Sequence, residues 1–105
     1  MCGLMYSDNS TNGATMPRYV IEREIPGIQL MAPEQLKSVS QSSCKILQEL
    51  GTDIQWIESF VTEDKLYCVY FSKNEELIRE HACRGNFPAN RISKLHTVIG
   101  PFTAE

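Results

Sequence analysis

The stretch from Lys65 to Pro88 constrains the fold most, because its residue pattern changes within one short segment from that of a strand to that of a helix. Residues 66–71 are rich in the aromatic and β-branched side chains that suit a pleated surface. Ser72 and Asn74 compete for the N-cap of the helix that follows, and the chain leaves this helix at Gly85. Strands and helices must therefore share one core in this chain.

The rest of the chain supplies three more strands and one more helix. Pro33 suits the first position of a helix, and Gly51 suits the residue that follows the last one. The predicted elements are strands over residues 18–25, 54–62, 65–71 and 92–99 and helices over 33–50 and about 75–84. The order β-α-β-β-α-β predicts an α+β, ferredoxin-like fold, in which a four-stranded antiparallel sheet carries both helices on one face.

Length and composition indicate one domain and exclude two kinds of partner. Residues 1–16 hold one charge and many Ser, Thr, Asn and Gly, which predicts a flexible N-terminal extension before a domain over 17–105. The net charge of −3 and the scattered basic residues argue against nucleic acid. No apolar window is long enough for a membrane span, and the N-terminus lacks the features of a secretory signal. We therefore expect a cytoplasmic protein whose cysteines are free thiols.

The hairpin register divides the side chains of its two strands between two faces. If Thr62 pairs with Lys65, one face carries Ile57, Ser59, Val61, Leu66, Cys68 and Tyr70. The other face then carries Trp56, Glu58, Phe60, Tyr67, Val69 and Phe71. Both faces are largely apolar, but two helices can cover only one of them. The pattern predicts a homodimer of the dimeric α/β-barrel kind, and the alternative is that one end of the chain folds back over the open face.

One candidate site lies beneath the helices. Cys44, Cys68 and His81, with Ser59 beside them, are predicted to converge if Cys68 faces the helices. Two thiols and an imidazole form a site that transition metals favour. The alternative is structural, because buried cysteine is a common small hydrophobic residue and a histidine near a core is usually hydrogen-bonded.

A second candidate set lies on the strands. Glu22, Glu58 and His96 each occupy a position whose neighbours two residues away are mostly apolar. A carboxylate on an apolar face needs a partner, because burying it unpaired is unfavourable. A pocket between the two sheets of a dimer, lined by Glu58 and Tyr67, would hold a cation or a small ligand. The alternative is a solvated edge position or an ion pair with a neighbouring arginine.

Long stretches of the sequence resemble a family of small bacterial domains of unknown function, with members described as nickel-binding or nickel-responsive. The stretches that carry the resemblance are PRYVIEREIPG, SQSSCKILQEL and the pattern WIxSxVTxDKxYCVY followed by EExIREHAxxxxFP. The resemblance spans roughly residues 17–100. It implies a ferredoxin-like homodimer with a Ni²⁺ site, and it places His81, Cys68 and Cys44 at positions of the family pattern. It also makes Met16 the usual start.

Two functions follow as expectations. The first is a non-enzymatic, homodimeric metal-binding protein for nickel, with ligands drawn from His81, Cys68, Cys44, Glu58 and Glu22. The alternative is a cofactor-free enzyme of the dimeric α/β-barrel type, a monooxygenase or isomerase with a pocket between sheet and helices lined by Tyr67, Tyr70, Trp56 and His81. That alternative depends on fold analogy. No CxxC, HExxH, P-loop or GxGxxG motif is present to support a redox, zincin or nucleotide mechanism.

Overall fold

Four strands and two helices follow one another in the predicted order in the computed structural model, which describes residues 16–105. The elements are β1 (Arg18–Glu24), α1 (Pro33–Leu50), β2 (Ile54–Val61), β3 (Lys65–Ser72), α2 (Glu75–Gly85) and β4 (Arg91–Lys94). Two short 3₁₀ helices, η1 (Ile28–Leu30) and η2 (Pro101–Ala104), follow β1 and end the chain. The predicted N-terminal extension lies almost wholly outside the described residues.

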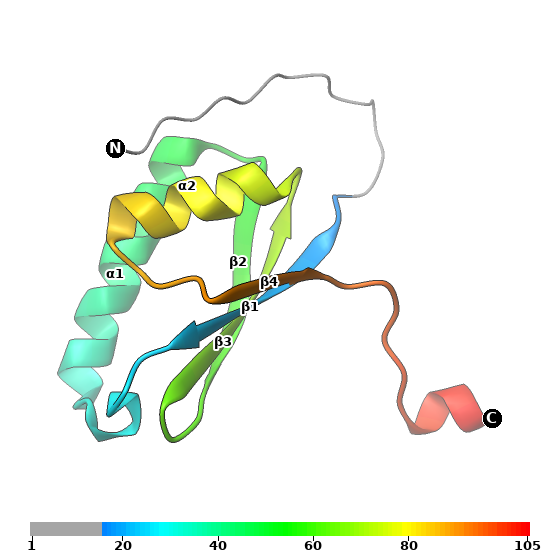
Figure 1. Cartoon of the computed structure of the whole chain (residues 1–105). Coiled ribbons are helices and arrows are strands. Elements are labelled where there is room, and N and C mark those ends of the chain that lie inside the picture. The colour runs from blue at the N-terminus through cyan, green and yellow to red at the C-terminus, as the bar shows by residue number, and fades with distance from the viewer. Residues whose placement is uncertain (1–15) are drawn as a thin grey trace.

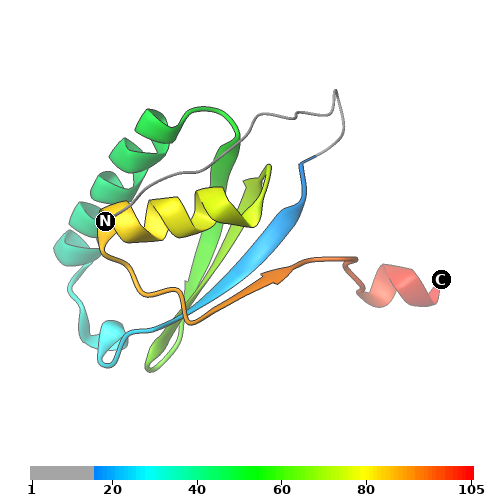
Figure 2. The same ribbon diagram turned by 45° about the horizontal axis from the view of Figure 1, so that its top comes forward.

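The strands form one antiparallel sheet in the order β2-β3-β1-β4. Both helices lie on the same face of this sheet, as the two views in Figure 1 and Figure 2 show. The strand order and the placement of the helices confirm the ferredoxin-like fold. No helix in the described part of the chain is long and apolar enough to cross a membrane.

The helix ends follow from local capping. Gly51 has a φ of 95°, a conformation that side chains rarely adopt, and it ends α1 as predicted. Asn74 caps α2, because its side-chain oxygen accepts a hydrogen bond from the backbone N–H of Leu77 at 2.9 Å. Ser72 instead donates its hydroxyl to the carbonyl oxygen of Asn74 at 2.7 Å. The competition between the two caps is therefore resolved in favour of Asn74.

The hairpin between β2 and β3 has the predicted register but contains a bulge. The backbone N–H of Thr62 donates to the carbonyl of Lys65 at 2.9 Å, and Ser59 lies opposite Cys68. The register shifts between Trp56 and Glu58, which leaves the intervening residue without a partner of its own. Trp56 consequently lies opposite Tyr70 and faces the helices, so the prediction that it lies on the uncovered face is wrong.

The core lies between the sheet and the helices. Its buried apolar members come from β1, β2, β3 and both helices: Tyr19, Ile21, Leu47, Ile54, Cys68, Tyr70, Leu77 and Ile78. Ile92 of β4 is partly buried and packs against them. Several polar side chains are buried with them: Arg23, Ser43, Ser72, Glu80 and His81. Buried polar groups are uncommon unless they are hydrogen-bonded. Their partners therefore show which part of the core is a candidate for a functional site.

The opposite side of the sheet, which we call the open face, carries no helix. The pairing register places on it the apolar side chains Val20, Phe60, Tyr67, Val69 and Phe71 and the charged side chains Arg18, Glu22, Glu58 and Lys65. The guanidinium of Arg18 lies over the ring of Phe71 at 5.4 Å, and Phe60 is 51% exposed. Apart from Trp56, and from Ile57 in the bulge, the predicted division of the hairpin side chains is confirmed.

The chain leaves the sheet earlier than predicted at its C-terminus. β4 ends at Lys94, and the last ladder bond is donated by the N–H of Leu95 to the carbonyl of Arg18, where β1 begins. Because β1 offers no partner beyond Arg18, the predicted strand over 92–99 cannot continue. The C-terminal segment then extends away from the body (Figure 1) and exposes Val98, Ile99 and Phe102. It does not fold back over its own open face.

Candidate functional site

Five buried polar side chains meet in one cluster beneath the helices. β1 contributes Arg23, α1 contributes Ser43, β3 contributes Cys68 and Tyr70, and α2 contributes His81. They lie together because Arg23, Cys68 and Tyr70 occupy strand positions whose side chains point to the helix-covered face. Ser43 and His81 lie on the faces of the two helices that turn toward the sheet.

His81 is held in an uncharged form by its surroundings. Its Nε2 lies 2.9 Å from the Ser43 hydroxyl oxygen, while its Nδ1 is buried and has no hydrogen-bond partner among the described residues. The imidazole packs against the rings of Tyr70 at 5.5 Å and Phe87 at 5.3 Å. Burial, followed by the positive charge of Arg23, lowers the pKa of His81 from 6.5 to about 4. His81 is therefore neutral near pH 7.

Arg23 is a buried cation whose partners are all uncharged. Its side chain is 2% exposed, and it donates from Nη1 to the carbonyl of Pro88 at 2.6 Å. It also donates from Nε to Sγ of Cys68 and from Nη2 to the hydroxyl of Tyr70, each at 3.4 Å. Burial raises the pKa of Tyr70 to about 12, so this phenol supplies no negative charge at neutral pH. Within residues 16–105, no carboxylate forms an ion pair with Arg23.

A cavity of about 600 Å³ opens beside this cluster, and we call it the sheet–helix cavity. Arg23, Ser43, Cys68 and Tyr70 line its buried end. Its walls are mostly apolar and come from β2, β3, α1, the segment around η1 and the loop after α2. A mostly apolar pocket with a few convergent polar groups is the usual form of a small-molecule binding site.

The structure brings together only part of the first predicted site. Cys68 and His81 belong to the buried cluster, and Ser59 lines the sheet–helix cavity. Cys44 is exposed on α1 and is not part of the cluster, because it lies one position beyond Ser43 and so points away from the core. Cys44 and Cys68 are free thiols, as expected. Cys83 is disulfide-bonded, so the expectation of free thiols is wrong there.

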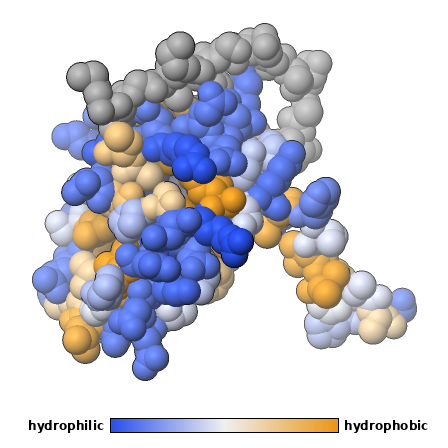
Figure 3. Space-filling model, in the orientation of Figure 1, coloured by the Kyte–Doolittle hydropathy of each residue, from blue (hydrophilic) through white to orange (hydrophobic). Residues whose placement is uncertain are grey.

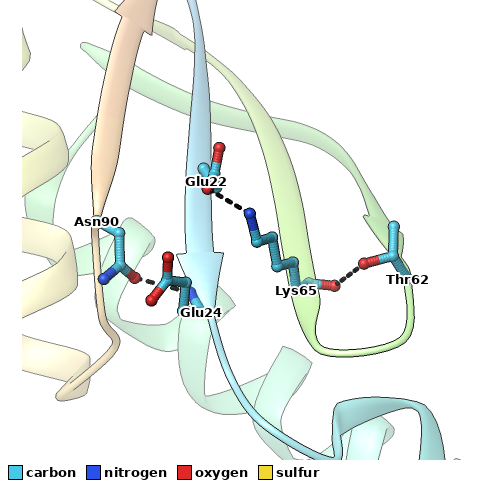
Figure 4. A network of polar contacts seen from close by, with 5 residues as sticks. All are labelled: Glu22, Glu24, Thr62, Lys65 and Asn90. Carbon is cyan, nitrogen blue, oxygen red and sulfur yellow. Dashed lines mark hydrogen bonds and ion pairs between the residues drawn. The ribbon is translucent and has the colours of Figure 1, made fainter.

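The carboxylates of the second predicted set stay apart from this cluster and from each other. Figure 4 shows Glu22 on β1 reaching across to Lys65 on β3, and their ion pair has an N–O distance of 2.9 Å. Glu22 thus pairs with a lysine rather than with an arginine. Glu58 is exposed on the open face of the edge strand β2, and His96 is exposed just beyond β4.

Two of the four aromatic or histidine residues that were expected to line an enzyme pocket do line this cavity. Trp56 and Tyr70 line the sheet–helix cavity. Tyr67 projects from the open face, because it alternates with Cys68 along β3. His81 lies behind Ser43 and Tyr70 rather than in the cavity wall.

Residues 19–95 match the model of a family described as "Nickel responsive protein SCO4226-like". The chain belongs to this family. The fold is also similar to that in the crystal structure of SCO4226 from Streptomyces coelicolor A3(2), with a TM-score of 0.63 and 14% sequence identity over 78% of this chain and 99% of that one. A search of curated protein sequences gives no match.

The predicted nickel ligands lie apart within one chain. No group of three or more His, Cys, Asp or Glu side chains with the geometry of a metal site occurs in the described residues. His81 is fully buried, and Nε of the Arg23 guanidinium lies 3.4 Å from the Cys68 sulfur, where its charge repels a cation. The orphaned Nδ1 of His81 alone does not make a site.

Arg23 is the residue that the sequence analysis missed. Its burial had a signal in the sequence, because Arg23 falls on the same strand face as Tyr19, Ile21 and Ile25. An arginine at an apolar position of a strand indicates either the end of the strand or a buried charge with a structural or binding role.

Proposed function

We propose that this protein is a small cytoplasmic homodimer that binds Ni²⁺ at sites made by two copies of the chain. The family to which the chain belongs supplies the link to nickel. The proposal places the metal at the interface, because the predicted donors within one chain are dispersed. It also places the metal on the open face rather than in the buried cluster, where Arg23 repels a cation.

The uncovered apolar surface carries the proposal of a homodimer. The open face presents Tyr67, Val69, Phe71 and Phe60, and the C-terminal segment adds exposed Val98, Ile99 and Phe102. Figure 3 shows these C-terminal hydrophobic residues standing clear of the body. Apolar surface of this extent on two neighbouring features is typical of an interface, and a second copy covers both at once.

The symmetry of such a dimer determines which ligands can meet. Two identical sheets packed by their open faces are related by a two-fold axis that lies between them. If the axis runs along the strands, β2 of one copy lies over β4 of the other. Glu58, at the level of Ser93 in the sheet, then approaches the segment that carries His96 in the second copy.

Glu58 and His96 are suitable donors for this purpose. Both are exposed, and an imidazole with a carboxylate is a donor combination that divalent nickel accepts. The site predicts one Ni²⁺ for each chain and two for each dimer.

Titration calorimetry with Ni²⁺ on tag-free protein tests the metal site. Glu58→Gln and His96→Gln should each weaken Ni²⁺ binding at least about tenfold, because each removes a ligand. His81→Gln is the matched control for loss of an imidazole and should bind as the unaltered protein does. Loss of binding in His81→Gln, with Glu58→Gln and His96→Gln unaffected, would overturn the interface site.

Light scattering coupled to size-exclusion chromatography tests the homodimer. Val69→Lys places a charge in the middle of the open face and should give a monomer. Gln55→Lys changes the same face at the edge strand and should leave the dimer intact. If the unaltered protein were monomeric at all concentrations, the proposal of a homodimer would be contradicted.

A further inference from the structure

Arg23 is a buried charge without a counter-ion among residues 16–105, and this feature is the one that most requires a ligand. Transfer of a guanidinium into an apolar interior is strongly unfavourable unless a negative charge or a full set of hydrogen bonds accompanies it. Arg23 is 2% exposed, and its partners are a thiol, a phenol and a backbone carbonyl. None of these partners is an anion.

The hydrogen bonds of Arg23 also leave part of its donor capacity unused. A guanidinium has about five N–H donors. Nε, Nη1 and Nη2 each donate once, to Cys68, Pro88 and Tyr70 respectively. One N–H on each terminal nitrogen is left. Two adjacent donors on a planar cation match the two oxygens of a carboxylate.

The position of Arg23 makes this capacity accessible to a ligand. The residue lines the buried end of the sheet–helix cavity, whose volume of about 600 Å³ lies within the range of small-molecule sites. The other end is bordered by exposed residues, among them Pro26, Val39 and Val61. A ligand can therefore enter from solvent and reach the guanidinium.

We propose that the sheet–helix cavity binds a small organic monocarboxylate with an apolar body, and that Arg23 binds its carboxylate. The apolar walls, to which Trp56, Leu36, Leu66 and Phe87 contribute, enclose the body of the ligand. This site is separate from the nickel site proposed on the open face and does not depend on it.

The lining of the cavity limits the charge of the ligand to one. Arg23 is the single Lys or Arg side chain among the lining residues, so it balances one negative charge. Glu24, at the exposed rim, disfavours a second. Phosphate esters and dicarboxylates therefore fit the site less well than a monocarboxylate does.

The surrounding groups keep the site selective for an anion. The fully buried His81 has a pKa lowered to about 4, so it adds no positive charge near pH 7. The Tyr70 hydroxyl, bonded to Nη2 of Arg23, stays protonated and can donate in turn. Ser43 on α1 is hydrogen-bonded to His81 on α2. The cluster thus presents donors and one fixed positive charge.

Binding can be measured through the fluorescence of Trp56, because it is the only tryptophan and lines the cavity. The probes are decanoate and its neutral counterpart decanol, which share the same apolar body. Decanoate should bind at least about tenfold more tightly than decanol. A parallel titration with 2-naphthoate distinguishes an aliphatic from an aromatic preference. Equal binding of decanoate and decanol would overturn the proposal. It would also be overturned if neither decanoate nor 2-naphthoate bound.

Substitution of Arg23 separates the role of its charge from that of its packing. In Arg23→Met, decanoate binding should fall at least about tenfold while decanol binding is unchanged. Unchanged decanoate binding in the folded Arg23→Met variant would overturn the proposal.

A second pair of variants tests the location of the site without altering the buried cluster. Val39→Phe narrows the cavity from the exposed face of α1 and should weaken decanoate binding at least about tenfold. Gln41→Phe is the matched control, because it adds the same ring to an exposed position of α1 outside the cavity. Both retain Trp56 as the only tryptophan. Decanoate binding to Val39→Phe as tight as to Gln41→Phe would place the ligand elsewhere and overturn the proposal, even if Arg23→Met failed to fold.

Discussion

Nε2 of His81 on α2 and the hydroxyl oxygen of Ser43 on α1 lie 2.9 Å apart, and this hydrogen bond joins the two helices inside the core. The bond forms where both side chains are buried, so it fixes how the helices sit on the sheet. A proton added to His81 has no acceptor at Nδ1 and faces the charge of Arg23. The uncharged imidazole is therefore part of the folded structure.

The stability of the protein should fall as the pH is lowered from about 6.5 towards 4. The folded-state pKa of His81, about 4, lies below its unfolded value of 6.5, so the unfolded state binds more protons in this window. The full contribution of His81 is present above pH 6.5, and the loss approaches about 3 kcal/mol at pH 4, since one pKa unit corresponds to about 1.4 kcal/mol. Urea denaturation at a series of pH values measures this loss in the free energy of unfolding.

His81→Gln should flatten this pH dependence between about pH 6.5 and 5, where few carboxylates titrate. His96→Gln removes an exposed histidine and should retain the dependence. An unchanged slope in His81→Gln would show that another group is responsible.

The sequence predicted the fold well because its signals were local. The spacing from Pro33 to Gly51 delimits α1 on its own, and Thr62 with Lys65 sets the register of the hairpin. Each of these features depends on neighbours in the chain. The C-terminal limit of β4 was not predictable in this way, because it depends on where β1 begins, at Arg18.

The site was predicted less completely because its features depend on contacts between distant residues. Cys68 and His81 were correctly placed beneath the helices, but Cys44 was not, since one position along a helix changes the direction of a side chain by about 100°. The bulge that places Trp56 and Glu58 on opposite faces has no signal in the sequence around Ile57. The burial of Arg23 depends on Pro88 and Tyr70, which the alternation of β1 does not reveal.

Deletion of Ile57 should preserve the sheet. The bulge places Trp56 opposite Tyr70 and Glu58 opposite Val69, and these pairings continue regularly without the extra residue. The emission maximum of Trp56 should therefore stay at the wavelength of the unaltered protein. Ile57→Ala, which keeps the chain length, is the control. A shift of the emission to that of a fully exposed tryptophan in the deletion variant alone would show that the bulge holds Trp56 inwards.

Asn74→Ala should destabilise the protein by about 1 kcal/mol, because it removes the cap of α2. The side-chain oxygen of Asn74 accepts the N–H of Leu77 at 2.9 Å, and alanine has no acceptor. Asn74→Asp keeps an acceptor and should retain most of the stability in urea denaturation. Equal losses in the two variants would assign the effect to another contact of Asn74.

Gly85→Ala should displace the ring of Phe87, because a methyl group at Gly85 would overlap it. That ring packs on His81 at 5.3 Å and lies 5.6 Å from the guanidinium carbon of Arg23. Overpacking of this kind costs about 1–3 kcal/mol, offset in part by the helix propensity of alanine. In a Phe87→Leu background the same change should cost less, and the difference between the two backgrounds measures the clash. Identical costs in both would exclude it.

Arg23→Met should fold with a stability within about 1 kcal/mol of that of the unaltered protein, or above it. Replacement of a buried unpaired charge by an apolar side chain of similar length is often neutral or stabilising. Arg23→Ala should lose more, because it leaves a void in addition. Urea denaturation of the three proteins without ligand makes the comparison. If the methionine variant lost about 3 kcal/mol or more, the bonds of Arg23 to Pro88 and Tyr70 would be needed to hold the fold together. A charge that the folded chain does not need for stability is instead what a binding site for an anion requires.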